Sequence, residues 1–140
     1  AWVYDMMSGG NKSFYRVENG KRQYYDIPSK SYKNIPGKEE FIILENLSHN
    51  IVWKNADSKV TDLGDGVINF AWHSKSYTLG SAVIEGLNKS IELAEKNYRG
   101  LVVGHQGSDF SLGANLGLVF MYAIEQDYDE LNFMVQQFQN

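Results

Sequence analysis

Glycines and small residues between Gly100 and Leu116 are spaced so that a backbone N–H group could face an anion. The apolar run 100–104 is bounded by glycines, which predicts a buried strand, and residues 110–116 open a helical pattern. Gly113 would let the main chain approach a ligand where that helix begins, and N–H groups at a helix start attract anions. The same residues also fit an ordinary strand-to-helix loop that needs Gly113 only for its backbone angles.

Three histidines and one serine could take part in chemistry elsewhere. His49, His73 and His105 have no second histidine or carboxylate at metal-ligand spacing, so we expect solvated or hydrogen-bonded surface side chains and no metal site. Ser111 would need His73 or His105 as a base, together with a carboxylate, to act as a nucleophile. No Gly-x-Ser-x-Gly turn is present, so the sequence disfavours a serine nucleophile.

Two further patterns are interpreted as non-catalytic. The carboxylates Glu125, Asp127, Asp129 and Glu130 surround a turn between two helical patterns, where they would be solvated, and Asp127 or Asp129 could cap the second helix. The run 104–107 does not complete Gly-x-Gly-x-x-Gly, so no dinucleotide site is expected in this chain.

Composition limits the class of protein. A chain of 140 residues with 43% hydrophobic content suits one principal domain, and its net charge of −4 without a dense basic run disfavours a nucleic-acid partner. There are no cysteines, no apolar stretch long enough for a membrane span and no signal-peptide layout, so we expect a soluble, cytoplasmic protein. The chain begins with Ala1 and ends in helical rhythm, which indicates a fragment of a longer protein.

The first part of the chain is predicted to hold short elements. Residues 1–10 have helical spacing that ends at two glycines, and residues 14–27 form two strands around an Asn-Gly turn, which is a strong hairpin signal. Pro28 and Pro36 predict loops, and the apolar run 40–44 is interpreted as a packing element at a domain junction.

The rest of the chain predicts an α/β architecture. Four strands are expected, at residues 51–54, 59–63, 67–72 and 100–104. A turn at 64–66 joins the second strand to the third. Residues 79–96 form an amphipathic helix with Leu79, Val83, Leu87, Ile91 and Ala94 on one face. Because that helix joins two strands, the strands should be parallel. Two further helices are expected at 116–125 and 128–139.

These features together carry a family resemblance. The hairpin ending in Ile68-Asn69-Phe70, the loop 73–79, the helix, the strand and Phe110-Ser111-Leu112-Gly113-Ala114-Asn115 resemble the N-terminal half of the crotonase (enoyl-CoA hydratase/isomerase) fold. Within that superfamily, these sequence motifs are similar to those of bacterial fused 3-hydroxyacyl-CoA dehydrogenase/enoyl-CoA hydratases. The resemblance therefore implies a junction segment over residues 1–57, made of the tail of a dehydrogenase part and a β-hairpin, and a partial crotonase-like β-β-α domain over 58–140.

The resemblance also implies a site. Ala114 would offer one backbone N–H of the oxyanion hole that holds a thioester oxygen, and Gly113 and Asn115 would flank it. The loop Ser74-Lys75-Ser76-Tyr77 would line the acyl-CoA tunnel, where Lys75 could attract CoA phosphates or could simply be solvated. Asn115 replaces the family's usual acidic residue, and Tyr77 replaces the Asn of its Asn-Ala-Leu signature. Neither change affects the Ala114 N–H, because every residue except proline supplies one.

Two functions remain in view. The first is a segment of a fatty-acid β-oxidation enzyme that binds acyl-CoA, uses no cofactor within this chain and belongs to a parent that uses NAD. By resemblance, the second oxyanion N–H and the catalytic glutamates would follow Asn140, so the isolated chain should be inactive and should associate with itself or with the rest of the parent. The alternative is a non-catalytic interaction or assembly module whose surface includes Tyr24, Tyr25, Tyr32 and Trp53.

Overall fold

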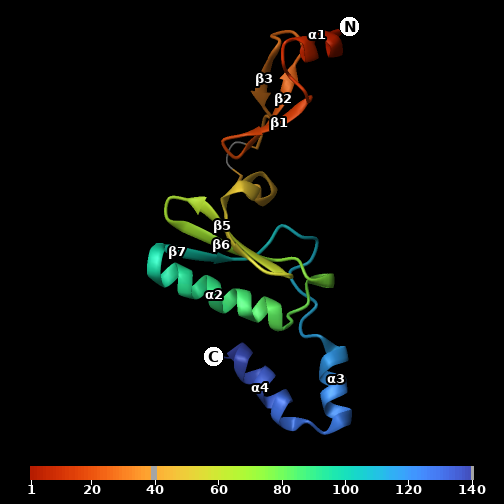
Figure 1. Cartoon of the computed structure of the whole chain (residues 1–140), viewed down its shortest axis with the longest axis vertical. Helices are drawn as coiled ribbons and strands as arrows, with labels where there is room; N and C mark the ends of the chain where they lie inside the picture. Colours follow the sequence, from red (N-terminus) through yellow and green to blue (C-terminus); the bar gives the residue numbers. More distant parts are fainter. Residues whose placement is uncertain (39–40, 140) are drawn as a thin grey trace. The chain divides into compact units, whose positions relative to one another are not determined.

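The computed structural model describes residues 1–38 and 41–139, and the chain divides into two compact units, residues 1–49 and 50–140 (Figure 1). Each unit combines helices with an antiparallel or mixed sheet, which confirms the predicted α/β class. The two units are described separately below.

The first unit is a three-stranded antiparallel sheet with a short helix. Its elements are α1 (Trp2–Ser8), β1 (Tyr15–Glu18), β2 (Lys21–Asp26) and β3 (Ser31–Asn34), in the sheet order β1-β2-β3. The predicted hairpin is confirmed: Asn19 and Gly20 both have positive φ, as the tight turn between two twisted strands requires. Met6 of α1 and Tyr25 of β2 are buried and form the small core.

The strand β3 was not expected, because a loop was predicted between the two prolines. Its residues alternate little in hydrophobicity, so the strand depends on cross-strand contacts. Tyr32 meets Tyr25 edge-on at 5.5 Å between ring centroids, and the Arg16 guanidinium lies 4.1 Å above the Tyr32 ring. The lysine of β3, Lys33, forms an ion pair with Asp26 at 2.7 Å.

The packing element expected over residues 40–44 begins outside the described residues. From Phe41 onward the chain has no regular structure until the 3₁₀ segment η1 (Leu44–Asn50). Phe41 and Ile42 are 71% and 50% exposed, so the described part of this run is not buried.

The second unit is built on a four-stranded sheet, in which the parallel pairing of β6 with β7 confirms the crossover prediction. Its strands are β4 (Ile51–Lys54), β5 (Ser58–Gly64), β6 (Val67–Trp72) and β7 (Gly100–Val103), in sequence order across the sheet. The described residues place β7 at an edge, with Val102 and Val103 48% and 46% exposed. The prediction of a buried strand is therefore wrong on this point, because only one neighbouring strand covers it.

The helix α2 (Ser81–Asn97) covers one face of this sheet (Figure 1). The core between them consists of five buried apolar side chains: Val60, Ile68, Phe70, Trp72 and Val83. The helix and the sheet approach closely at Gly86, where an added Cβ would meet the Ser58 Oγ at 2.1 Å and the Phe70 ring at 2.9 Å.

The helix begins at Ser81, so Leu79 precedes it rather than lying on its apolar face, and the buried face also differs from the predicted one at Ile91. Gly86 and Ser90 are buried together with Val83, whereas Ile91 is 42% exposed. The pattern of apolar residues alone placed Ile91 on the core face. The sheet approaches the helix closely at Gly86, however, so the face that meets the sheet includes the small residues Gly86 and Ser90.

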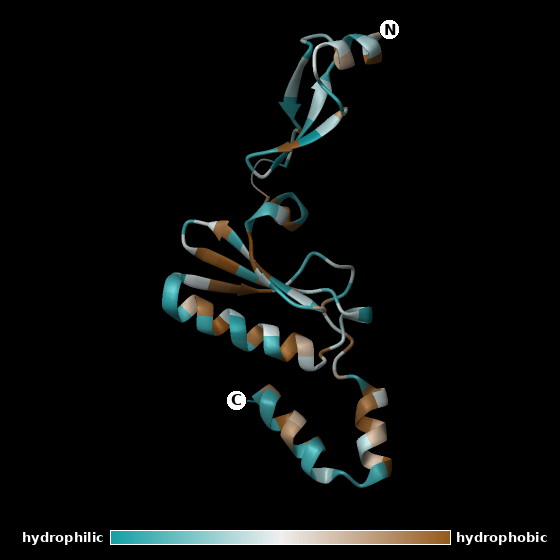
Figure 2. Ribbon diagram, viewed as in Figure 1, coloured by the Kyte–Doolittle hydropathy of each residue, from teal (hydrophilic) through white to brown (hydrophobic). Residues whose placement is uncertain are grey.

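Two helices follow the loop after β7. They are α3 (Leu116–Glu125) and α4 (Tyr128–Gln139), and their bounds match the predicted ranges. Asp127 caps α4, because its Oδ1 accepts a hydrogen bond from the Glu130 N–H at 3.3 Å, and this resolves the choice between Asp127 and Asp129. Figure 2 shows α3 as apolar along most of its length.

Candidate functional site

The two segments that carry the predicted site meet in the second unit. The Leu79 N–H donates to the Gly113 carbonyl oxygen at 2.8 Å, and Leu79 forms a parallel bridge with Ala114. The end of the 74–79 loop is thus attached to the start of α3 by main-chain contacts.

Ser111 joins the same two segments through its side chain. Its hydroxyl donates to the Tyr77 carbonyl oxygen at 2.8 Å and accepts from the Gly113 N–H at 2.9 Å. The Trp72 indole N–H donates to the same Tyr77 oxygen at 3.2 Å. The hydroxyl proton of Ser111 is therefore donated to a main-chain carbonyl oxygen and not to a histidine base.

The 74–79 loop has an unusual backbone. Ser76 and Tyr77 have φ values of +54° and +53°, in a region that residues other than glycine, Asn and Asp rarely adopt. Hydrogen bonds hold the loop in this form: the Ser74 hydroxyl donates to the Thr78 carbonyl oxygen at 2.7 Å, and the Tyr77 N–H donates to the Ser74 carbonyl oxygen at 2.9 Å. Such strain is kept only where the surroundings enforce it, and it is frequent at functional sites.

The Ala114 amide is available to a ligand. Ala114 is exposed, and within residues 1–38 and 41–139 its N–H donates to no protein acceptor. The Asn115 side chain caps α3 by accepting from the Gly117 and Leu118 N–H groups at 3.1 and 3.3 Å, and so leaves the Ala114 amide free. Gly113, with φ +87°, makes the turn that aims this amide, and it has open space beside its Cα.

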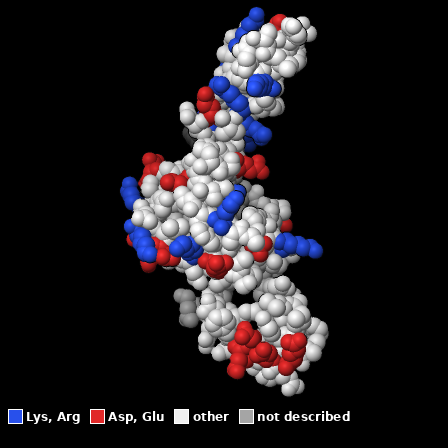
Figure 3. Space-filling model, in the orientation of Figure 1, with Lys and Arg blue, Asp and Glu red and all other residues white. Residues whose placement is uncertain are grey.

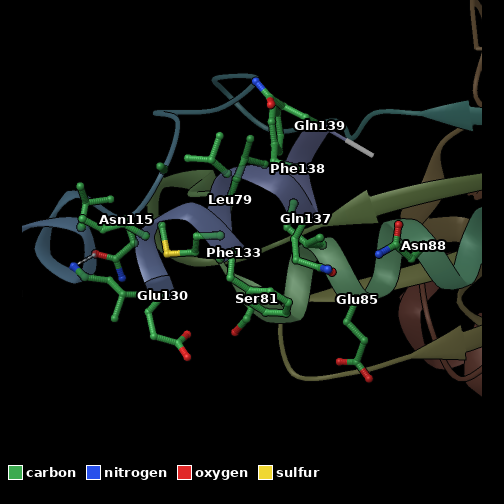
Figure 4. Close-up of a pocket in the computed structure, with 18 of the residues that line it drawn as sticks. Leu79, Ser81, Glu85, Asn88, Asn115, Glu130, Phe133, Gln137, Phe138 and Gln139 are labelled. Atoms are coloured by element: carbon green, nitrogen blue, oxygen red, sulfur yellow. Dashed lines mark hydrogen bonds between the residues drawn. The ribbon is translucent and has the colours of Figure 1, made fainter. Parts of the chain in front are cut away.

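A large, mainly apolar groove of about 1130 Å³ adjoins this amide. Gly113, Ala114 and Asn115 form part of its wall, and Asn115 is labelled in Figure 4. The apolar lining comes from four elements and the segment before α2: Trp53, Leu79, Ile84, Leu118, Val119, Tyr122, Leu131, Phe133, Met134, Val135 and Phe138. Figure 4 shows Leu79 and Phe138, which are far apart in the sequence, facing this same space.

The charges around the groove are mostly negative. Glu85, Glu92 and Glu130 lie along it, with Lys89 as the cation among the lining residues. Residues 100–140 contain no lysine or arginine, and the acidic side chains gather on the α3–α4 hairpin in Figure 3. Hydrogen bonds from Lys96 and Lys89 lower the pKa of the Glu92 carboxyl to about 2.

The predicted site residues divide into two groups. Gly113, Ala114 and Asn115 line the groove, whereas Ser74, Lys75, Ser76 and Tyr77 do not. The loop contacts the site through Tyr77 instead, whose carbonyl oxygen accepts hydrogen bonds from Ser111 and Trp72. Lys75 is exposed and has no ion pair in the described part of the chain.

The structure also places the three histidines. His49 and His73 are exposed, and His105 is half-buried and hydrogen-bonded to Phe110 and Gly107, with neither ring nitrogen bonded to Ser111. No group of three or more histidines and carboxylates that could hold a metal ion occurs among the described residues. The contacts of His105 were missed by sequence reasoning, because a single histidine in a polar loop gives no periodic signal.

The aromatic residues of the alternative interaction surface differ in exposure: Tyr25 is buried, whereas Tyr24, Tyr32 and Trp53 are half-buried. Tyr25 is buried at 4% exposure, and Trp53 packs against the core of the second unit. Tyr25 is therefore unavailable to a partner.

None of the helices in the described residues is long and apolar enough to cross a membrane.

Comparison with known proteins gives one informative similarity. No protein-family model and no solved structure matches the chain. A Bacillus subtilis (strain 168) protein described as a probable 3-hydroxyacyl-CoA dehydrogenase is 36% identical over 140 residues. The match includes 99% of this chain but only 18% of that protein. The chain is thus similar, over nearly its whole length, to a segment of about a fifth of a much longer protein.

Proposed function

We propose that this chain is a segment of a fatty-acid β-oxidation enzyme of the fused 3-hydroxyacyl-CoA dehydrogenase/enoyl-CoA hydratase type. Its contribution is acyl-CoA binding, with the Ala114 N–H as one donor to the thioester carbonyl oxygen. The observation that carries the proposal is the free, exposed Ala114 amide at the wall of the apolar groove. The similarity to the Bacillus subtilis dehydrogenase supports it at the level of the parent enzyme.

The chemistry follows from the thioester. When a proton is removed from, or added to, the carbon next to a thioester, negative charge develops on the carbonyl oxygen. A backbone N–H already aimed at that oxygen stabilises the charge without reorganisation, and losing one such donor costs about 3–4 kcal/mol of transition-state stabilisation. Ala114 suits this role because Ser111 and Leu79 fix its neighbour Gly113.

The groove suits the rest of such a ligand. Its walls are mainly apolar, as expected for a site that receives a hydrocarbon chain, and Ala114 lies in one of them. An acyl chain could therefore lie between α2 and α4 while its carbonyl faces the Ala114 amide.

The remaining steps belong to other parts of the parent. Glutamates that the resemblance places outside this chain would hydrate the 2-enoyl-CoA, and the dehydrogenase part would oxidise the 3-hydroxyacyl product with NAD. The loop 104–107 lacks the glycine pattern of a dinucleotide site, and Tyr77 and His105 lie close to Gly107 within it, so we assign NAD binding to the dehydrogenase part of the parent. The isolated chain is expected to be catalytically inactive.

The proposal is tested by titrating the ¹⁵N-labelled chain with acetoacetyl-CoA and with a thioether analogue of equal length that lacks the carbonyl. We expect the Ala114 amide resonance to move with the thioester and to move much less with the thioether. Apolar groove residues such as Val119 should respond to both ligands. An unresponsive Ala114 amide at saturating thioester would refute the proposal.

A matched pair of variants isolates the N–H group. Ala114→Pro removes the donor, and Ala114→Ser keeps it with a side chain of similar size. The proline variant should lose the preference for thioester over thioether, and the serine variant should keep it. A folded Ala114→Pro chain with the original preference would contradict the assignment.

A further inference from the structure

We propose that His105 is a positioning residue for the Ala114 amide, acting as a neutral imidazole that closes the loop between β7 and α3 onto Tyr77. The inference rests on the proposed role of Ala114 and adds to it the group that sets the direction of this donor. Neither the sequence pattern nor the similarity to the dehydrogenase assigns a role to His105.

The hydrogen bonds of His105 define its protonation. The Gly107 N–H donates to Nδ1 at 3.1 Å, so Nδ1 must carry a lone pair. The proton therefore lies on Nε2, which donates to the Phe110 carbonyl oxygen at 2.8 Å. Both ring nitrogens are thus used, and together they join two points of the loop three residues apart.

Aromatic contacts fix the same ring from its sides. The imidazole stacks on Tyr77, with centroids 4.2 Å apart and planes 14° apart, and it meets the Trp72 indole edge-on at 4.5 Å. Gly107 lies so close to Tyr77 that an added Cβ would be 2.3 Å from the phenol ring. The loop therefore lies directly against Tyr77, and a larger residue at position 107 would displace the Tyr77 ring.

A short path leads from His105 to Ala114. His105 holds Phe110 through its carbonyl and Tyr77 through its ring. The next residue, Ser111, bridges Tyr77 to the Gly113 N–H, and Gly113 precedes the donor. Tyr77 has a strained φ of +53°. Stacking of His105 on the Tyr77 ring therefore also helps to fix the Tyr77 carbonyl, which accepts hydrogen bonds from Ser111 and Trp72.

Such a path matters because hydrogen bonds weaken steeply when their angle falls, and a displacement of about 1 Å in a catalytic group can cost about 100-fold in rate. His105 does not line the groove, so it influences a ligand only through the position of the loop. It is accordingly a positioning residue and not a catalytic one.

The test compares affinities for acetoacetyl-CoA and its thioether analogue, because their ratio reports the carbonyl contact alone. His105→Phe keeps an aromatic ring but removes both hydrogen bonds, and His105→Asn keeps an acceptor near the Nδ1 position. His73→Asn is the matched control, since His73 is exposed and its side chain has no hydrogen bond in the described structure.

We expect His105→Phe to reduce the thioester preference about three- to tenfold, the range for one lost hydrogen bond, while thioether affinity stays within about twofold. His105→Asn should give an intermediate ratio and decides the question if the phenylalanine variant does not fold. The control should match the unmodified chain. A loss that is equal for both ligands, or a folded His105→Phe with the original ratio, would overturn the inference.

A ligand-free measurement separates this inference from the proposed function. A through-hydrogen-bond ¹⁵N–¹⁵N coupling should connect the Gly107 amide to the His105 Nδ1, and its absence would refute the clamp. If the unmodified chain shows the coupling but equal affinity for both ligands, the proposed function has failed, and the positioning role fails with it. If it prefers the thioester but shows no coupling, only the role of His105 is lost.

Discussion

Ser111 connects the two segments of the site through its side chain. Its hydroxyl bridges the Tyr77 carbonyl and the Gly113 N–H, and it therefore fixes both the strained loop and the turn before Ala114. Removing this hydroxyl would leave a partly buried donor and a partly buried acceptor without that partner, which costs stability.

Ser111→Ala should lower the free energy of unfolding by about 1–3 kcal/mol, because the Gly113 N–H loses its acceptor and the Tyr77 carbonyl loses one of two donors. Urea denaturation measures this change. Ser108→Ala is the control, since Ser108 contacts only the exposed Asp109 side chain, and its cost should be within about 0.5 kcal/mol. Equal effects of the two substitutions would contradict the bridging role.

The positive φ of Ser76 is a second feature at this scale. Ser76 is exposed, and a left-handed backbone costs a non-glycine residue about 1–2 kcal/mol. Ser76→Gly removes this strain but increases the freedom of the unfolded chain, so the net gain should be at most about 1 kcal/mol. Thermal unfolding measures it, with Lys75→Gly as a control that should destabilise. A clear loss of stability in Ser76→Gly would contradict the strained conformation.

At the scale of elements, the close contact between α2 and the sheet depends on the glycine at position 86, which has no side chain. Gly86 allows Ser58 and Phe70 to approach the helix backbone, and Ser58, Phe70 and Gly86 are all buried. The tight contact orients α2 over the core, and α2 in turn forms one wall of the groove.

Gly86→Ala should therefore lower the stability by about 1–3 kcal/mol through overpacking, although alanine is the better helix former. The control is Gly100→Ala, whose Cβ would meet nothing closer than Val67 at 4.0 Å. Denaturant unfolding of both variants gives the comparison. A stabilising Gly86→Ala substitution would show that the helix and the sheet are less closely packed than described.

The exposed face of α2 has a pH-dependent contribution. Lys96 and Lys89 lower the pKa of Glu92 to about 2, below its usual 4.5, so the folded state favours the carboxylate. This contribution is complete above about pH 4.5 and is lost as the pH falls towards 2. Glu92→Gln should reduce the pH dependence of the thermal unfolding midpoint between pH 5 and pH 3, whereas Glu95→Gln should leave that dependence unchanged. A slope that is unchanged in Glu92→Gln would refute the pairing.

For the whole molecule, the α3–α4 hairpin leaves a large apolar surface exposed. Leu116, Phe120 and Ile124 follow one another at turns of α3 and are 76%, 65% and 64% exposed. A contiguous apolar stripe of this kind favours association in water. The negative charge of residues 100–140 opposes contact between copies of this hairpin, so that contact should strengthen as salt screens the charge.

We therefore expect the isolated chain to self-associate at high concentration, and more so at higher salt. Light scattering should show a lower mass for Phe120→Ser than for the unmodified chain. Tyr4→Ser, at the 77%-exposed Tyr4 of the first unit, is the control and should leave the mass unchanged. A monodisperse monomer under all of these conditions would contradict the prediction.

The local elements were largely determined by the sequence. The Asn19-Gly20 turn and the bounds of α3 and α4 follow from turn chemistry and periodicity, which act over a few neighbouring residues. These features depend on contacts close in the sequence.

The remaining features were decided by tertiary contacts. β3 is held by the Tyr25–Tyr32 pair, Gly86 replaces a large side chain where α2 meets the sheet, and His105 finds its partners in Tyr77 and Trp72. No local pattern encodes which side chains will meet, whether across one turn, as for Tyr25 and Tyr32, or across more than 25 residues of chain, as for Tyr77 and His105. The sequence thus determined that a helix would begin soon after Gly113, and the tertiary structure decided the conformation of the loop before it, because packing between distant segments selects one loop geometry among those the local backbone allows.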